Sequence, residues 1–381
     1  MRFWGCLLLV ALIQGALAGT TGATDTADNR LVSVLRADQV WNAVTTTPDG
    51  RIFVGFPHLD GTPGPRVAEA LPDGSMRPYP DAAWNDWAPG HDAGQAFVRS
   101  NAMRIGPDGN LWVVDTGTPG FGDAPVPGGA KIVVIDVGTG KVTRVYPLGS
   151  VTSGGSAIDD IRFNGRTAYV TDAGMPGLIV LDLRSGGARR VLDNDRSTTD
   201  ERPMYAEGKI MVGPGGKQVR IHADQLEVSP DGRHLYFQPA SGPLYRVETR
   251  LLDDPSVPAA ELSRHVESWV DTPSTGGTAI DAEGNIYLSD VNRLRILKIT
   301  PDRRVTTLIQ DPRLEWADAM WIDTEGFLWI PVAQLNRIAP FQGGTSRVRF
   351  PVHIYKMRIG VRPAPNDHGA ARTGPGGSPS P

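Results

Sequence analysis

The chain has 381 residues, of which 40% are hydrophobic and 45 are glycine, and its formal net charge at pH 7 is -4. These values suit one large all-β domain, and the absence of a basic field excludes a typical nucleic-acid-binding protein. The single cysteine, Cys6, lies near the N-terminus, so the rest of the chain can use neither disulfides, nor a thiol nucleophile, nor cysteine-bound zinc.

The first 18 residues have the pattern of a secretory signal peptide. Arg2 is followed by a short apolar run that ends in Ala16-Leu17-Ala18, a small-x-small cleavage site. An uncleaved anchor is the alternative, although the run is short for a membrane span. We expect a secreted or periplasmic protein without a membrane attachment after cleavage, and a polar linker over residues 19–30.

The rest of the chain repeats one phrase, a short apolar strand, a polar-Gly turn and a second strand. The turn glycines of the six copies are Gly50, Gly109, Gly165, Gly232, Gly284 and Gly326. Their intervals of 42 to 67 residues each leave room for a four-stranded sheet. Repeats of this length made of strands and turns are typical of a β-propeller, so we predict six blades. A sandwich of six hairpins is the alternative.

The ends of the repeat region predict how the ring closes. Residues 31–34 look like a lone strand, which we expect to complete the last blade by pairing near residues 348–355. The propeller then spans residues 31–360. Residues 361–381 are rich in Pro, Gly and Ser and predict a disordered tail. We expect a monomer.

Three long connections interrupt the repeat, at residues 56–96, 116–129 and 193–218. Loops of this length in a compact domain commonly act as lids or binding loops. The first contains Trp84 and Trp87, which are candidates for ligand binding. Alternatively, these two side chains only pack the loop against a blade.

Several phrases resemble the yellow/major royal jelly protein family. They include LWVVDTG at 111–117, KIVVID at 131–136 and AYVTDAGMPGLIVLD at 168–182, and the similarity runs from about residue 35 to 345. The chain resembles a short, bacterial-type member. The resemblance implies a six-bladed propeller, in agreement with the copy count. It implies less about function, because some members bind biogenic amines at one mouth of the propeller, some are associated with dopachrome conversion and others are structural.

A second resemblance concerns the site. In six-bladed lactonases similar to gluconolactonase and senescence marker protein, Glu, Asn and Asp side chains placed just before the innermost strands hold a divalent metal at one end of the tunnel. The corresponding positions here are Asn42, Asn101, Asp159, Asp224 and Asp318. The fifth copy has Gly276 there. This chain departs from the lactonase pattern in the first blade, where Asn42 stands in place of Glu.

Convergence of these oxygens at the tunnel mouth has two interpretations. Crowded carboxylates raise one another's pKa unless a cation lies among them, and such oxygen ligands suit Ca²⁺ or Mg²⁺. Alternatively, each Asn or Asp caps a turn or bonds the neighbouring backbone.

Two functions of different class follow. The first is a binding protein for a small, aromatic or amine-bearing molecule, held by the acidic ring and by Trp84, Trp87, Trp316 or Trp321. The second is a metal-dependent lactonase-like hydrolase or a dopachrome-type isomerase (tautomerase). His222 and Asp224 are then the candidate catalytic residues. A platform for protein interactions is a third possibility, supported only by the fold.

Overall fold

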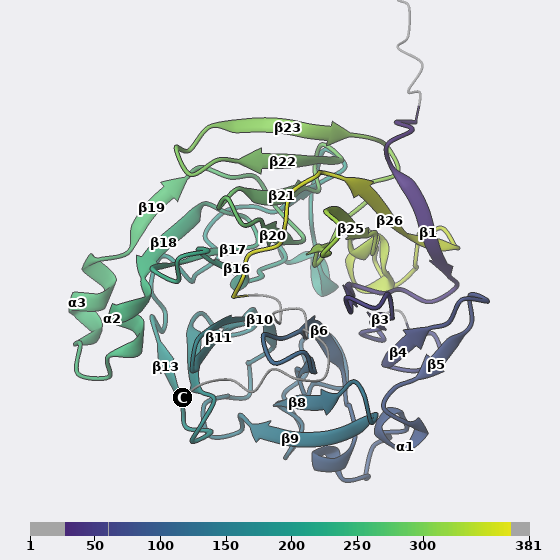
Figure 1. The fold of residues 1–381 in the computed structure, drawn as a ribbon, viewed down its shortest axis with the longest axis horizontal. Coiled ribbons are helices and arrows are strands. Elements are labelled where there is room, and N and C mark those ends of the chain that lie inside the picture. Colours follow the sequence, from purple (N-terminus) through teal and green to yellow (C-terminus); the bar gives the residue numbers. More distant parts are fainter. Residues whose placement is uncertain (1–26, 60, 367–381) are drawn as a thin grey trace, which may run out of the picture.

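A computed structural model describes residues 27–59 and 61–366. Six four-stranded antiparallel sheets are arranged around a central axis (Figure 1), which confirms the predicted six-bladed propeller. Within the described residues, no helix is both long enough and apolar enough to cross a membrane. The signal peptide and most of the tail expected from the sequence lie outside the described residues.

Each blade uses four strands that follow one another in the chain, except the last. The first three blades contain β2 (Ala43–Thr46), β3 (Ile52–Gly55), β4 (Val67–Ala70) and β5 (Met76–Pro78); β6 (Ser100–Ile105), β7 (Leu111–Asp115), β8 (Lys131–Asp136) and β9 (Lys141–Pro147); and β10 (Ile158–Asn164), β11 (Thr167–Asp172), β12 (Leu178–Asp182) and β13 (Ala188–Val191).

The next two blades contain β16 (Ala223–Val228), β17 (His234–Pro239), β18 (Leu244–Glu248) and β19 (Glu267–Val270), and β20 (Thr278–Ile280), β21 (Ile286–Asp290), β22 (Arg295–Ile299) and β23 (Val305–Gln310). The last blade contains β24 (Trp321–Ile322), β25 (Phe327–Pro331), β26 (Val352–Arg358) and the N-terminal strand β1 (Val32–Ala37). Because β1 pairs with β26, the N-terminal strand closes the ring as expected.

The remaining elements are short and lie outside the six sheets. They are the hairpin β14 (Tyr205–Ala206) and β15 (Lys209–Ile210), the helices α1 (Ala82–Asn85), α2 (Thr249–Asp253) and α3 (Ala259–Arg264), and the 3₁₀ turns η1 (Ala93–Gln95), η2 (Pro214–Gly216), η3 (Leu335–Arg337) and η4 (Ala339–Phe341). The connection at 56–96 is therefore only partly a loop, since it also supplies β4 and β5.

The six repeated phrases are the first hairpins of the six blades. All six turn glycines have a positive φ, from 59° at Gly165 to 88° at Gly50, so each turn uses a conformation that side chains disfavour. The second strand of a blade is mostly apolar and buried, as in β7, whose five residues are all buried and of which only Asp115 is charged. The fourth strand, such as β9, is largely exposed. A strand that is buried on both faces needs a nearly continuous run of apolar residues, whereas the outermost strand, which is partly exposed, does not.

The hydrophobic core consists of layers between neighbouring blades. One layer joins β6 to β9 with β10 to β12, and equivalent layers follow between the other blades. This packing leaves the leading ends of the innermost strands free to face the axis. The polar residues predicted from the sequence lie at those ends.

Candidate functional site

The leading ends of the innermost strands form a pocket of about 240 Å³ at one mouth of the tunnel. Its lining includes every position that the sequence comparison with the lactonase pattern selected: Asn42, Asn101, Asp159, Asp224 and Asp318, together with Gly276. We call the five polar residues the polar ring. They come from five different blades, so the structure brings together residues spread over most of the chain.

Three ring residues occupy irregularities of their strands. The pairing register shifts between Ser100 and Ala102, between Ile158 and Ile161, and between Ala223 and Gln225. Asn101, Asp159 and Asp224 fall inside these shifts. A bulged residue leaves the regular ladder and its side chain is re-aimed, which is a common arrangement beside binding sites. The same device in three successive blades turns the polar side chains towards the axis.

Hydrogen bonds connect part of the ring. The Nδ2 of Asn42 donates to Oδ1 of Asn101 at 3.2 Å, and the Nδ2 of Asn101 donates to Oδ1 of Asp159 at 2.5 Å. The Oδ1 of Asn42 is buried and has no hydrogen-bond partner within residues 27–59 and 61–366. An orphaned buried acceptor costs free energy until a donor or a cation reaches it.

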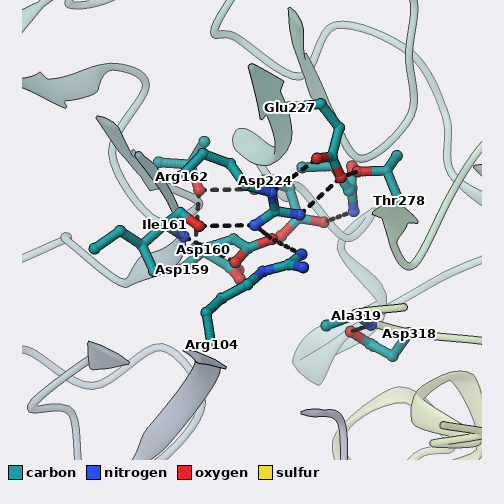
Figure 2. Close-up of polar contacts among 12 residues, drawn as sticks. Arg104, Asp159, Asp160, Ile161, Arg162, Asp224, Glu227, Thr278, Asp318 and Ala319 are labelled. Atoms are coloured by element: carbon teal, nitrogen blue, oxygen red, sulfur yellow. Dashed lines mark hydrogen bonds and ion pairs between the residues drawn. The ribbon is translucent and has the colours of Figure 1, made fainter. Parts of the chain in front are cut away.

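Asp318 completes the ring from the last blade. Its Oδ2 accepts from the indole N–H of Trp316 at 3.0 Å, and its Oδ1 accepts from the backbone N–H of Ala319 at 2.8 Å. Figure 2 shows Asp318 set apart from the group around Asp159 and Asp224. Asp318 therefore fits both interpretations of the ring. It lines the pocket, as a ligand-binding residue would, and it also accepts a hydrogen bond from the main chain, as a capping residue would.

Burial shifts the carboxyl groups of the ring towards the neutral form. Burial raises the pKa of Asp159 to about 6, and the nearby charge of Asp160 acts in the same direction. Burial also raises the pKa of Asp224 well above its usual value, with the charge of Asp159 as the next cause. Asp318 shows the same direction, again mainly through burial. Without a cation these shifts favour the protonated forms, most strongly at Asp224 and Asp318.

Among residues 27–59 and 61–366, no three His, Cys, Asp or Glu side chains are grouped closely enough to hold a metal ion. The ring nevertheless offers only oxygen donors and amide groups, a set that suits a hard divalent cation or an organic ammonium group.

Next to Asp159 and Asp224, charged side chains from neighbouring blades form a buried network (Figure 2). The guanidinium of Arg162 binds Glu227 through two hydrogen bonds of 2.8 Å and lies 2.7 Å from an oxygen of Asp160. Thr278 donates a further bond of 2.8 Å to Glu227. Arg162 and Glu227 are each 1% exposed. These side chains come from the innermost strands of three successive blades, β10, β16 and β20.

Arg99 is a pocket residue that the sequence did not single out. It is 6% exposed and lines the pocket, and its Nε donates to Oγ1 of Thr116 at 3.0 Å. Its terminal nitrogens have no hydrogen-bond partner among the described residues. Burial lowers the pKa of Arg99 to about 10, while the charges of Asp159 and Asp115 act in the opposite direction. The group remains cationic at pH 7 and adds a donor beside the acidic ring.

Loops supply the walls above the ring. Phe121 and Asp123 come from the connection at 116–129, and Arg220 comes from the segment that leads into β16. The ring of Phe121 meets that of Phe341 edge-on, with centroids 4.9 Å apart. Two of the three long connections predicted to be binding loops contribute to the pocket, since Leu59 belongs to 56–96 and Phe121 to 116–129, whereas Arg220 lies just after 193–218.

The predicted tryptophans separate into two groups. Trp316 lines the pocket, whereas Trp84, Trp87 and Trp321 are not among its lining residues. Trp84 packs on Phe97 at 5.2 Å, and Trp87 belongs to a small apolar cluster under its loop, so the loop-packing alternative describes both. Trp321 is fully buried between blades and donates from Nε1 to Thr46.

His222 is close in the chain to the pocket residues Ile221 and Asp224, but it does not itself line the pocket. Its Nδ1 accepts from the backbone N–H of Asp200 at 3.1 Å, and burial lowers its pKa, which favours the neutral ring. This bond anchors the connection at 193–218 to the blade. The structure therefore gives His222 an anchoring contact, while its predicted neighbour Asp224 does line the pocket.

The architecture defines a six-bladed β-propeller with one polar pocket of mixed charge at a tunnel mouth. Comparison with protein-family models places the chain more narrowly. Residues 102–362, more than half of the chain, match the major royal jelly protein model, so the chain belongs to that family. No curated protein matches it in sequence.

Solved structures with a similar fold are distant in sequence. A gluconolactonase from Xanthomonas campestris is 13% identical, with a TM-score of 0.53 over 86% of this chain and 89% of its own. The calcium-binding protein regucalcin from Agrobacterium tumefaciens is 12% identical, with a TM-score of 0.52 over 89% and 98%. A luciferin-regenerating enzyme is 11% identical, with a TM-score of 0.56 over 90% and 99%. At these identities the likeness concerns the fold.

Proposed function

We propose that this protein binds a small, positively charged molecule in the pocket at the tunnel mouth. The observation that carries the proposal is the convergence of Asp159, Asp224 and Asp318 in one pocket, where burial and mutual repulsion raise their pKa values. A bound cation relieves that repulsion and lets the carboxyl groups ionise, so binding of positive charge is favoured.

The rest of the pocket fits an organic ammonium ligand. Trp316 and Phe121 supply apolar surface beside the carboxyl groups, and an ammonium over an aromatic face gains about 0.5 to 2 kcal/mol. The unpartnered terminal nitrogens of Arg99 can receive an acceptor atom of the same ligand. Export to the periplasm or the exterior remains part of the proposal, since it rests on residues 1–18 alone.

A divalent cation is the second candidate, favoured by the buried, unpartnered Oδ1 of Asn42. Asn42, Asn101, Asp159, Asp224 and Asp318 would hold Ca²⁺ or Mg²⁺ through oxygen atoms. When bound, such an ion would polarise an ester or lactone carbonyl. The chain's own contribution would be to orient the substrate through Arg99 and Trp316 and to supply a ring carboxylate as the base. The solved gluconolactonase and regucalcin propellers make this candidate worth testing.

Calorimetry on the purified protein, first stripped of metal, tests both candidates. We expect phenethylamine to bind, and its neutral isostere 2-phenylethanol to bind at least about tenfold more weakly, because only the amine carries the charge that the ring attracts. Calcium or magnesium that binds stoichiometrically and is removed by a chelator supports the second candidate. Failure of the amine and both metal ions to bind would contradict the proposed function.

A further inference from the structure

A second concave site lies beside the mouth pocket, between the hairpin β14–β15 and the segment that follows η3. It encloses about 500 Å³, a size typical of small-molecule sites. Its lining comes from two distant stretches of the chain, Ala206 to Val212 and Asn336 to Arg349. We call it the hairpin cleft. Leu335 lines the mouth pocket and Asn336 lines the hairpin cleft, so the two sites are neighbours with different linings.

An ion-pair network gives the cleft a defined wall. The Nη2 of Arg337 lies 2.5 Å from Oε1 of Glu207 and 2.8 Å from Oε2 of Glu315. The Nδ2 of Asn336 donates to the same two carboxylates, at 2.9 Å and 2.7 Å. Glu207 is on the hairpin, so these contacts hold the hairpin against the last blade. These ion pairs and hydrogen bonds thereby fix the two sides of the cleft, the hairpin and the last blade, relative to one another.

The charge that remains in the cleft is positive. Arg337 pairs with two glutamates, so that network has one carboxylate in excess. Lys209, Arg347 and Arg349, which also line the cleft, have no acidic partner among the described residues and outweigh that excess. The chain as a whole is acidic, with a net charge of -4, so this concentration of unpaired cations is a local feature. Such a site attracts an anionic group.

Apolar side chains lie beside these cations. Ile210 and Val212 line the cleft and are 40% and 42% exposed, and they are among the few large hydrophobic residues of the described chain that face solvent. Phe341 and Met211 add buried apolar surface to the same lining. Exposed apolar surface beside unpaired charge is a signature of a binding site.

An unsatisfied polar atom marks the cleft independently. Asn336 is 4% exposed, and because its Nδ2 is used by the two glutamates, its Oδ1 is left buried without a partner in the described part of the chain. Buried polar atoms are nearly always hydrogen-bonded, so this acceptor calls for a donor from outside the chain. A ligand hydroxyl or N–H group would satisfy it.

We propose that the hairpin cleft is a second ligand site, which takes a small amphipathic anion. The apolar body of the ligand lies against Ile210, Val212 and Phe341, and its acidic group, a carboxylate, sulfonate or phosphate, lies against Lys209, Arg347 and Arg349. This ligand class is opposite in charge to the one proposed for the mouth pocket. The inference therefore does not depend on the function of that pocket.

Fluorescence titration with naphthalene-2-sulfonate tests the inference on the full-length protein. We expect the sulfonate to bind the wild type, and the neutral naphthalene-2-sulfonamide to bind at least about tenfold more weakly, because it lacks the charge. In the double variant Arg347→Glu/Arg349→Glu, sulfonate binding should also weaken at least about tenfold, since two attractive charges become repulsive. Both arginines are exposed, so the substitutions should leave folding intact.

A matched control is Arg184→Glu/Arg264→Glu, which changes the net charge equally at two exposed arginines outside the cleft. It should bind the sulfonate like the wild type. Asp224→Asn, which alters only the mouth pocket, should also leave sulfonate binding unchanged. The inference is overturned if the wild type does not bind the sulfonate, if the sulfonamide binds as well, if both double variants behave alike, or if Asp224→Asn abolishes sulfonate binding.

Discussion

Replacing Asp224 by Asn should weaken binding of a cationic ligand or metal ion at the tunnel mouth on the order of a hundredfold. Asp224 lies in the β-bulge of β16, between Asp159 and Gln225, where its ionised form is the one that a cation stabilises. Asn has nearly the same shape and can still accept from Gln225, but it cannot ionise. Calorimetric titration of the variant and the wild type at pH 7 measures the difference.

The same substitution should not lower the free energy of unfolding. The pKa of Asp224 is raised in the folded state, so its protonated form stabilises the fold below that pKa, and this contribution is lost as the pH rises through it. Asn carries no such dependence. At pH 8 the metal-free variant should therefore be at least as stable as the wild type. The exposed Asp86→Asn is the matched control and should change neither property. If Asp224→Asn bound the cation with wild-type affinity, Asp224 would not be part of the binding site.

Replacing Arg162 by Met should have the largest effect on stability, a loss of about 3–5 kcal/mol in the free energy of unfolding. Arg162 is 1% exposed and pairs with both Glu227 and Asp160 (Figure 2), so its removal leaves two buried carboxylates without their main cationic partner. Met retains much of the volume, which limits the cavity contribution. Urea unfolding followed by tryptophan fluorescence measures the change.

Arg166→Met provides the control for that experiment, because Arg166 is in the same blade, its side chain is 70% exposed, and its ion pair with Asp182 is long at 3.6 Å. Its stability should stay within about 0.5 kcal/mol of the wild type. If Arg162→Met is equally harmless, the buried charge network does not stabilise the fold, and water must reach the carboxylates of Glu227 and Asp160.

The scaffold could be predicted from the sequence because each copy of the repeated phrase contains the residues that determine its hairpin. The glycines at the hairpin turns adopt positive φ, and the apolar runs beside them become the doubly buried second strands. The polar ring was also predictable, since each of its residues precedes or begins an innermost strand. The β-bulges that redirect Asn101, Asp159 and Asp224 leave no recognisable pattern in a single sequence.

Other features depend on contacts between distant segments. Aromatic content alone does not separate Trp316, which lines the pocket, from Trp84 and Trp87, which pack their loop. Arg99 becomes a candidate site residue only because the fold buries it beside Asp159. Nothing in the sequence distinguishes it from the other scattered arginines. The hairpin cleft joins stretches more than 100 residues apart, so neither half of it is recognisable from its own sequence.

The central claim is that the ring carboxyl groups exchange protons for a bound cation. Calorimetric titration of phenethylamine and of calcium into metal-free protein at pH 7, repeated in PIPES and in Tris, measures this exchange. Those buffers differ in ionisation enthalpy, so the account predicts different heats, with a net release of about one proton or more per bound cation. Binding with the same heat in both buffers, or no binding of either cation, would contradict it.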